Sequence, residues 1–342
     1  MQFGIIGSGS WATALAKILT DNKHSINWYV RSERIVTHLH SRHHNPDYLS
    51  SVYFDSNQLM LSTNVSEVIA ASDYLVMAVP SAYVIDTLHK TSKDSFEGKK
   101  VISAIKGILP DNNLLLNEYL YREYDFSQEN YFTVMGPCHA EEVAAEKLSY
   151  LTFSGIHAEA TTEVARCFNT EYLNTIVNND VAGVQFAAVL KNIYALGAGI
   201  AHGLEYGDNF LSVLIANSAD EMAGFLHRAG VPHMEVGIHA SVDHRVSPNY
   251  AASVYLGDLL VTCYSLYSRN RTFGNMIGKG YSVSSAKLEM KMVAEGYNAS
   301  RCIHFINDRV NADMPIADAI YKILWENLHP REGFIKIEEV LV

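Results

Sequence analysis

The sequence predicts an α/β protein, with a doubly wound, mainly parallel sheet over residues 1–179 and an all-helical domain over residues 180–342. Strand-like and helix-like segments alternate through the first half, as they do in parallel sheets whose faces are covered by helices. After Asp180 only helical periodicity recurs, and Asn178-Asn179-Asp180 is the expected boundary. A glycine-rich turn, Gly7–Ala12, also follows the first apolar run directly and leads into a helix.

The expected strands of the first half are short apolar runs separated by helical stretches. The strands are Gln2–Ile6, Ser25–Val30, Tyr74–Val79, Val101–Ala104, Tyr131–Met135, Tyr150–Phe153 and Leu173–Val177. The helices expected between them include Trp11–Asp21, Ser32–His40, Ser81–Thr91 and His139–Ala145.

The second half opens with a helix expected over Val181–Leu204, which contains the only long apolar stretch of the chain. Because Gln185, Lys191 and Asn192 interrupt this stretch, we expect a buried helix rather than a membrane span. Further helices are expected at Phe210–Ala229, which ends before Gly230, at Tyr250–Tyr267, at Ser284–Val293, and from the favoured first-turn residue Pro315 through Trp325.

Length and composition favour an ordinary globular enzyme in the cytoplasm. A chain of 342 residues suits two domains, and 48% hydrophobic with 18% charged residues excludes a disordered or fibrous chain. The net charge of −11 argues against partners such as nucleic acid or anionic lipid, so a phosphorylated ligand would need a local basic cluster. The four cysteines show no CxxC spacing, and the first strand leaves no room for a signal peptide.

The glycine-rich turn matches the dinucleotide-binding fingerprint of a Rossmann-type domain. Gly7 would make the tight turn, Gly9 would let the backbone approach a pyrophosphate, and Ala12 is the small residue where the helix packs on the strand. The start of the helix, at Ser10 and Trp11, would face the negative charge of the pyrophosphate. We therefore expect NAD or NADP as the cofactor.

Arg31 follows the second strand, at the position where an acidic residue would grip the ribose hydroxyls of NAD. An arginine there can accommodate the 2′-phosphate of NADP instead. The alternative is a solvated arginine at a strand end. We favour the cofactor role because the fingerprint fixes the location.

Polar or turn-forming residues follow three other strands, in Val79-Pro80-Ser81, Ile105-Lys106-Gly107 and Met135–Ala140. The carboxyl ends of parallel strands are where an open sheet exposes its ligands. Lys106 is therefore a candidate point charge for a phosphate or carbonyl group, although a lysine that extends to solvent is an alternative.

Lys191 stands out because the surrounding segment, Gln185–Gly197, is rich in small and apolar residues. Desolvation would lower the pKa of this lysine into the range that is useful for acid–base catalysis, unless it lies at the edge of the helix. Asp258, within another apolar helix, could orient or pair with it. Downstream, Ser268-Arg269-Asn270 offers a hydroxyl, a guanidinium and an amide, a set suited to phosphate oxygens, although such a loop is usually a solvated turn.

The cluster of His38, His40, His43 and His44 raises the question of a metal site. No cysteine or acid at ligand spacing completes the set, so we expect a solvated, pH-sensitive loop and no metal.

Five motifs in register resemble bacterial NAD(P)-dependent glycerol-3-phosphate dehydrogenases, over about residues 2–330. They are Gly7–Ala16, Ile105-Lys106-Gly107, Gly136-Pro137-Cys138-His139-Ala140-Glu141-Glu142-Val143, Leu190-Lys191-Asn192 and Ser268–Gly274.

The resemblance implies that dihydroxyacetone phosphate is reduced at C2 by NADH or NADPH to sn-glycerol 3-phosphate, which feeds glycerophospholipid synthesis. It implies that Lys191 donates and accepts the proton at the C2 oxygen, and that the chain forms a homodimer. The implied substrate site comprises Lys106, Gly136, Cys138, Lys191, Asp258, Ser268, Arg269 and Asn270. The expected cofactor site comprises Gly7, Gly9, Ser10, Trp11, Arg31, Lys106, Ala140, Arg269, Val293 and Glu295, with Arg269 near both ligands.

The chain departs from the family pattern at a few positions. Ala12 stands where glycine is usual, which the fingerprint tolerates. Cys138-His139 replaces the commoner Ser/Thr-Phe, so a Cys138 contact would be made through the backbone. Phe210 and Asn217 stand where the family often has threonine and arginine.

Two other functions remain as alternatives from the residues alone. One is a hydroxyacid dehydrogenase of related architecture, against which the donor-rich Ser268–Arg271 segment favours a phosphorylated substrate. The other is a regulatory protein that binds a dinucleotide without turnover, against which the presence of Lys106, Lys191 and Asp258 argues.

Overall fold

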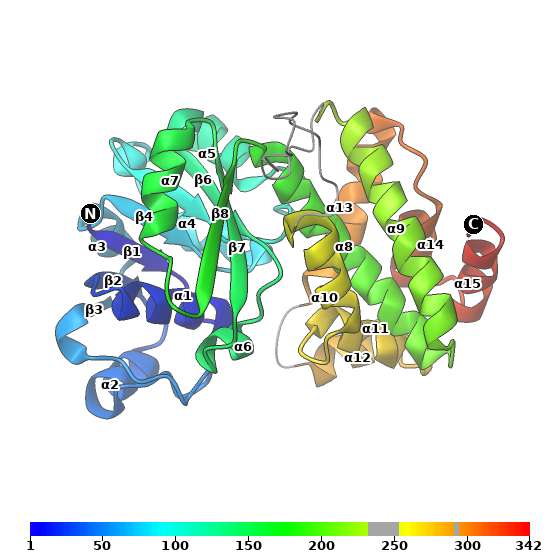
Figure 1. The fold of residues 1–342 in the computed structure, drawn as a ribbon, viewed down its shortest axis with the longest axis horizontal. Coiled ribbons are helices and arrows are strands. Elements are labelled where there is room, and N and C mark those ends of the chain that lie inside the picture. Colours follow the sequence, from blue (N-terminus) through cyan, green and yellow to red (C-terminus); the bar gives the residue numbers. More distant parts are fainter. Residues whose placement is uncertain (232–252, 291–293) are drawn as a thin grey trace, which may run out of the picture. The chain divides into compact units, whose positions relative to one another are not determined.

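The computed structural model describes residues 1–231, 253–290 and 294–342, which form two compact units (Figure 1). The sheet unit comprises Met1–Ile105 and Leu114–Val181, and the helical unit comprises Lys106–Asn113 and Ala182–Val342. The short segment Lys106–Asn113 therefore belongs to the helical unit, although the sequence-based boundary placed it in the first domain. One reason is that the side-chain amide of Asn192 donates a hydrogen bond to the Lys106 carbonyl (2.9 Å).

The sheet unit contains one eight-stranded sheet with the strand order β3-β2-β1-β4-β5-β6-β7-β8 (Figure 1). All neighbouring strands are parallel except β6 and β7, so the predicted mainly parallel, doubly wound sheet is confirmed. The strands are β1 Phe3–Ile6, β2 Ile26–Tyr29, β3 Leu59–Ser62, β4 Tyr74–Met77, β5 Lys100–Ser103, β6 Tyr131–Met135, β7 Ser149–Gly155 and β8 Leu173–Asn178.

The edge strand β3 is the one strand that the sequence did not predict. None of its four residues is buried, and its apolar run, Leu59-Met60-Leu61, is only three residues long and lies between polar residues. At the centre of the sheet, β1 pairs with both β2 and β4, and the strand order reverses its direction there. Such a reversal leaves a crevice beyond the carboxyl ends of the strands, which is where ligands bind in open α/β sheets.

The helices of the sheet unit connect these strands. They are α1 Ser10–Asp21, α2 Glu33–Arg42, α3 Val65–Ala70, α4 Val84–Leu88, α5 Leu116–Tyr124, α6 Ala140–Ala144 and α7 Ala158–Arg166. The helix expected at Ser81–Thr91 is a 3₁₀ turn, Ser81–Tyr83, followed by α4.

The described part of the helical unit contains helices and no strand, as predicted. The helices are α8 Val181–Gly203, α9 Asp208–Arg228, α10 Asp258–Tyr264 preceded by a π turn at Ser253–Gly257, α11 Arg269–Gly278, α12 Val283–Glu289, α13 Glu295–Val310, α14 Pro315–Trp325 and α15 Pro330–Glu338. The start of the predicted helix Tyr250–Tyr267 and the end of Ser284–Val293 lie outside the described residues. Helices α11, α13 and α15 were not predicted.

Helix α8 is the core of the helical unit. It is long and apolar enough to cross a membrane by length and composition, but 94% of its most apolar window is buried inside the protein, as expected for a core helix. Glycines let α11 approach it closely, because a Cβ on Gly199 would lie 2.1 Å from the Arg271 carbonyl oxygen. A Cβ on Gly274 would similarly lie 2.0 Å from the Leu196 oxygen.

A buried carboxylate links α8 to two further helices. Glu221 of α9 accepts hydrogen bonds from the Tyr194 hydroxyl of α8 (3.1 Å) and from the backbone N–H groups of Ile316 (2.8 Å) and Ala317 (2.9 Å) at the start of α14. Burial raises the pKa of Glu221 to about 7, although the three hydrogen bonds by themselves would lower it. Tyr194 is one helical turn from Lys191, so these hydrogen bonds also hold the part of α8 that carries Lys191.

Candidate active site

The glycine-rich turn joins β1 to α1 as the fingerprint predicts. Gly7 has φ +126°, and a Cβ on it would lie 2.6 Å from the Ala78 carbonyl oxygen, so the turn needs glycine there. A Cβ on Gly9, the N-cap of α1, would meet nothing within 4 Å, and no side chain caps the helix. The first turn of α1 also carries no acidic residue, so its N–H groups and open surroundings fit a pyrophosphate.

Arg31 lies between β2 and α2 with its side chain exposed. Among the described residues, no carboxylate forms an ion pair with Arg31, whereas its neighbour Arg34 is paired with Asp47. An exposed guanidinium without such a partner keeps its donors for an anionic ligand.

The loop after β6 brings Gly136, Cys138 and Ala140 to the same end of the sheet as the fingerprint turn. Gly136 has φ +135°, and a Cβ on it would lie 2.9 Å from the Tyr150 carbonyl oxygen. Cys138 and Ala140 are buried, and His139 precedes the short helix α6 that Ala140 begins.

In the helical unit, Lys191 is buried and forms an ion pair with Asp258, the partner considered for it from the sequence. Burial lowers the pKa of Lys191 to about 8; the Asp258 carboxylate opposes this shift and the Lys106 ammonium adds to it. Lys106 therefore lies near Lys191, although it comes from the segment after β5. A buried ammonium with this pKa is suited to proton transfer near neutral pH.

Only one of the two carboxylate oxygens of Asp258 pairs with Lys191. Its Oδ1 pairs with Lys191, and Thr262, one turn further along α10, lies 3.4 Å from the same oxygen and donates to the Asp258 carbonyl (2.5 Å). Its Oδ2 is buried and has no hydrogen-bond partner among the described residues. A buried carboxylate oxygen without a donor is costly, so this atom is available for a ligand hydroxyl.

A chain of amide hydrogen bonds joins four separate segments around Lys191. Gly296 N–H donates to Asn270 Oδ1 (2.9 Å), Asn270 Nδ2 donates to Asn192 Oδ1 (2.8 Å), and Asn192 Nδ2 donates to the Lys106 carbonyl (2.9 Å). The N–H at one end and the carbonyl at the other fix the orientation of both amides. Neither Asn192 nor Gly296 was predicted as a site residue, and only the position of Asn192 next to Lys191 hinted at it.

The segment Ser268-Arg269-Asn270 is not a solvated turn. The Ser268 side chain caps α11 by accepting from the Arg271 N–H (3.3 Å), so Arg269 and Asn270 occupy the first turn of a ten-residue helix. Asn270 is buried, and the Nε atom of Arg271 is buried without a hydrogen-bond partner among the described residues. A helix N-terminus that carries a guanidinium is suited to phosphate.

Two predicted cofactor residues remain. Glu295 is the first residue of α13 and lies next to Gly296 of the amide chain. Val293 lies outside the described residues. In the described ranges, no three His, Cys, Asp or Glu side chains gather as metal ligands, and the ring nitrogens of His38 and His44 lie 3.0 Å apart.

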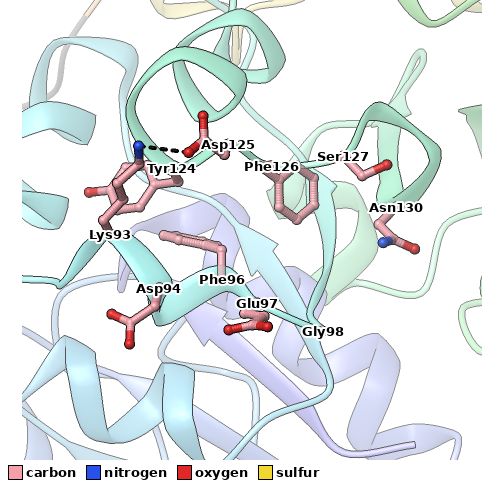
Figure 2. Close-up of a pocket in the computed structure, with 10 residues that line it drawn as sticks. All are labelled: Lys93, Asp94, Phe96, Glu97, Gly98, Tyr124, Asp125, Phe126, Ser127 and Asn130. Carbon is pink, nitrogen blue, oxygen red and sulfur yellow. Dashed lines mark ion pairs between the residues drawn. The ribbon is translucent and has the colours of Figure 1, made fainter.

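A separate cavity of about 520 Å³ is lined by residues that precede β5 and β6 (Figure 2). It therefore lies at the amino ends of these strands, whereas the fingerprint turn follows the carboxyl end of the parallel strand β1. Phe96, Tyr124 and Phe126 line it, and the dashed line in Figure 2 marks the ion pair of Lys93 with Asp125 (2.6 Å). Its three acidic residues outnumber its one lysine, which makes it unsuited to a phosphorylated ligand.

A Rossmann-type sheet and a buried lysine paired with a carboxylate are features of a dinucleotide-dependent oxidoreductase. Models of the NAD-dependent glycerol-3-phosphate dehydrogenase family match residues 2–161 with its N-terminal part and residues 180–334 with its C-terminal part. The chain belongs to this family.

Curated relatives agree with this assignment, and a solved structure shares the fold. The chain is 33% identical to a glycerol-3-phosphate dehydrogenase [NAD(P)+] of Listeria monocytogenes serotype 4b, over 97% of this chain and 94% of the relative. It is 32% identical to that of Oceanobacillus iheyensis, over 97% and 92%. The fold resembles the glycerol-3-phosphate dehydrogenase structure from Coxiella burnetii with a TM-score of 0.87 at 23% identity, over 99% of this chain and 98% of that one.

Proposed function

We propose that this chain reduces dihydroxyacetone phosphate to sn-glycerol 3-phosphate with NADH or NADPH, reversibly, and that Lys191 exchanges the proton at the C2 oxygen. The observation that carries the proposal is the buried ion pair of Lys191 with Asp258, which lies beside Lys106 in a family of NAD(P)-dependent dehydrogenases.

Side chains of the protein donate the proton to the C2 oxygen and stabilise the negative charge that develops on it. Bound NAD(P)H supplies the hydride. With a pKa of about 8, Lys191 is mostly protonated at neutral pH and can give its proton to an alkoxide as it forms. The Asp258 carboxylate orients this ammonium, and Lys106 adds a second positive charge that stabilises the developing oxyanion.

Two sets of residues complete the proposed site. Substrate contacts come from Lys106, Gly136, Cys138, Lys191, Asp258, Ser268, Arg269 and Asn270, and Arg269 with the start of α11 receives the phosphate. Dinucleotide contacts come from Gly7, Gly9, Ser10, Trp11, Arg31, Lys106, Ala140, Arg269, Val293 and Glu295.

We further propose that the enzyme works as a cytoplasmic homodimer that supplies glycerophospholipid synthesis. Its functional domains are residues 1–179 and 180–342, with Lys106–Asn113 of the first part of the chain belonging to the helical unit. Membrane insertion is not part of this proposal, since α8, the one helix among the described residues that is both long and apolar enough to span a membrane, is buried in the helical unit.

One assay tests the proposal. The loss of absorbance of NADH and of NADPH is followed in parallel with dihydroxyacetone phosphate and with unphosphorylated dihydroxyacetone. We expect turnover that depends on the phosphate, because Arg269 and the α11 N-terminus bind this group and unphosphorylated dihydroxyacetone lacks it. Equal kcat/KM for the two substrates would contradict phosphate recognition. Tight NADH binding without any turnover would favour a dinucleotide-binding regulator.

A further inference from the structure

Three buried side chains donate hydrogen bonds to the backbone of the cofactor turn. Each donates to one of three successive carbonyl oxygens, and each is 0% exposed. The three hydrogen bonds run from Trp28 Nε1 to the Gly7 oxygen (2.6 Å), from Asn45 Nδ2 to the Ser8 oxygen (3.1 Å) and from Thr13 Oγ1 to the Gly9 oxygen (2.9 Å).

Asn45 is the centre of this arrangement. Its Nδ2 also donates to Thr13 Oγ1 (2.9 Å), and its Oδ1 accepts the backbone N–H of Asp47 (3.0 Å). Because a backbone N–H can only donate, this contact fixes which end of the amide faces the turn. Asn45 therefore joins the Ser8 carbonyl and, through Thr13, the Gly9 carbonyl into one rigid unit.

The fixed carbonyls determine where the N–H groups of the turn point. In a trans peptide the N–H lies opposite the C=O, so holding three carbonyls on the protein side directs the following N–H groups away from it. The N-terminus of α1 that follows is uncapped and carries no acid in its first turn. These donors are the groups that a pyrophosphate would use.

We propose that Asn45, together with Thr13 and Trp28, is a positioning residue for the pyrophosphate of NAD(P). It sets the cofactor affinity by holding the turn in its binding conformation and does not touch the cofactor. The inference rests on the proposed seat of the pyrophosphate at Gly9–Trp11.

The segment that carries Asn45 is itself anchored to α2. Asp47 forms an ion pair with Arg34, and the Nε2 atoms of His44 and His38 lie 3.0 Å apart. The histidine-rich segment thus has a structural role, since it holds the loop that presents Asn45 to the turn.

The test compares two buried asparagines, one that binds the turn and one that does not. Asn45→Leu removes the donors to the turn at nearly constant volume, and Thr13→Val removes one hydroxyl. The matched control is Asn27→Leu: Asn27 is 3% exposed and donates to the Ala71 carbonyl (2.8 Å) and Ser72 Oγ (3.0 Å), none of which belongs to the turn. Dissociation constants for NADH, ADP-ribose and adenosine are measured by fluorescence and calorimetry, with Tm and kcat for each variant.

We expect Asn45→Leu and Thr13→Val to raise the Kd of NADH and of ADP-ribose by about ten-fold. The Kd of adenosine, which has no phosphate, and kcat at saturating NADH stay near wild type. Asn27→Leu lowers Tm to a similar degree and leaves all three dissociation constants within about two-fold. Equal weakening of adenosine, or the same losses in Asn27→Leu, would overturn the proposal in favour of general destabilisation.

Gly9→Val separates this inference from the function on which it rests. A side chain at Gly9 has open space, so the variant should fold, but it would occupy the pyrophosphate seat. If Gly9→Val weakens NADH binding while Asn45→Leu and Thr13→Val do not, the seat stands and the positioning role is wrong. If Gly9→Val leaves NADH binding unchanged, the seat and the positioning role are both wrong.

Discussion

The two ligand-binding regions of this chain are built in opposite ways. The cofactor turn is a continuous stretch, Gly7–Ala12, whose glycines, helix start and small residues follow one another in the sequence. The site around Lys191 is assembled from distant segments that include Lys106, Asp258 and Asn270. A continuous site can be predicted from spacing alone, whereas an assembled site depends on how helices pack.

The largest expected effect tests the assembled site. Lys191→Met keeps the length and helix propensity of the side chain but removes its charge and proton. General acid–base groups contribute about 10²–10⁴-fold to rate, so kcat should fall by roughly a hundred-fold or more while NADH binding survives. Steady-state kinetics with cofactor affinity from fluorescence checks both parts. A folded Lys191→Met enzyme within a few-fold of wild type would disprove the mechanism and make Lys106 the next candidate.

This contrast explains how much could be predicted from the sequence. Local patterns predicted the alternating sheet, the all-helical second half and the fingerprint. They missed β3, because its edge position leaves its residues unburied, and α11, because it starts with the polar residues Ser268–Arg271. Lys191 and Asp258 were found as charges within apolar helices, which is a local signal of a distant partner.

The amide chain could not be predicted in the same way. Asn192, Asn270 and Gly296 are ordinary residues in the sequence, and their roles arise only where α8, α11 and α13 meet. The position of Lys106 in the helical unit likewise depends on a hydrogen bond across 86 residues. Buried polar networks of this kind carry no fixed spacing that a sequence pattern could reveal.

The next effect concerns the phosphate end of the assembled site. Arg269→Ala removes a charge-assisted hydrogen-bonding group worth about 1.5–3 kcal/mol, so KM for dihydroxyacetone phosphate should rise by roughly ten-fold or more. Unphosphorylated dihydroxyacetone serves as the internal control, because its reduction should change far less. Wild-type kcat/KM for the phosphorylated substrate would show that Arg269 does not bind the phosphate.

A pH profile tests whether the charges around Lys191 act on it as the geometry indicates. The proton donor is lost above its pKa of about 8, so reduction should slow as the pH rises through that value. Asp258 raises the pKa of Lys191 and Lys106 lowers it. Asp258→Asn should therefore move the alkaline limb of kcat to lower pH, and Lys106→Met should move it to higher pH. Shifts in the same direction for both variants would contradict this electrostatic arrangement.

The smallest expected effect returns to the local site. Arg31 is exposed and forms no ion pair with the described residues, so it can contact the 2′-phosphate that distinguishes NADPH from NADH. Arg31→Ala should raise the Kd of NADPH several-fold more than that of NADH, because a solvent-exposed charge pair contributes only about 1 kcal/mol. Arg42→Ala, at the far end of α2, is the matched control for the loss of one surface charge. Binding titrations at two salt concentrations separate a direct contact of Arg31 with the 2′-phosphate from the long-range effect of the protein's charge. Equal loss for both cofactors in Arg31→Ala would leave Arg31 without a role in cofactor choice, and the local site would then bind the dinucleotide through its backbone alone.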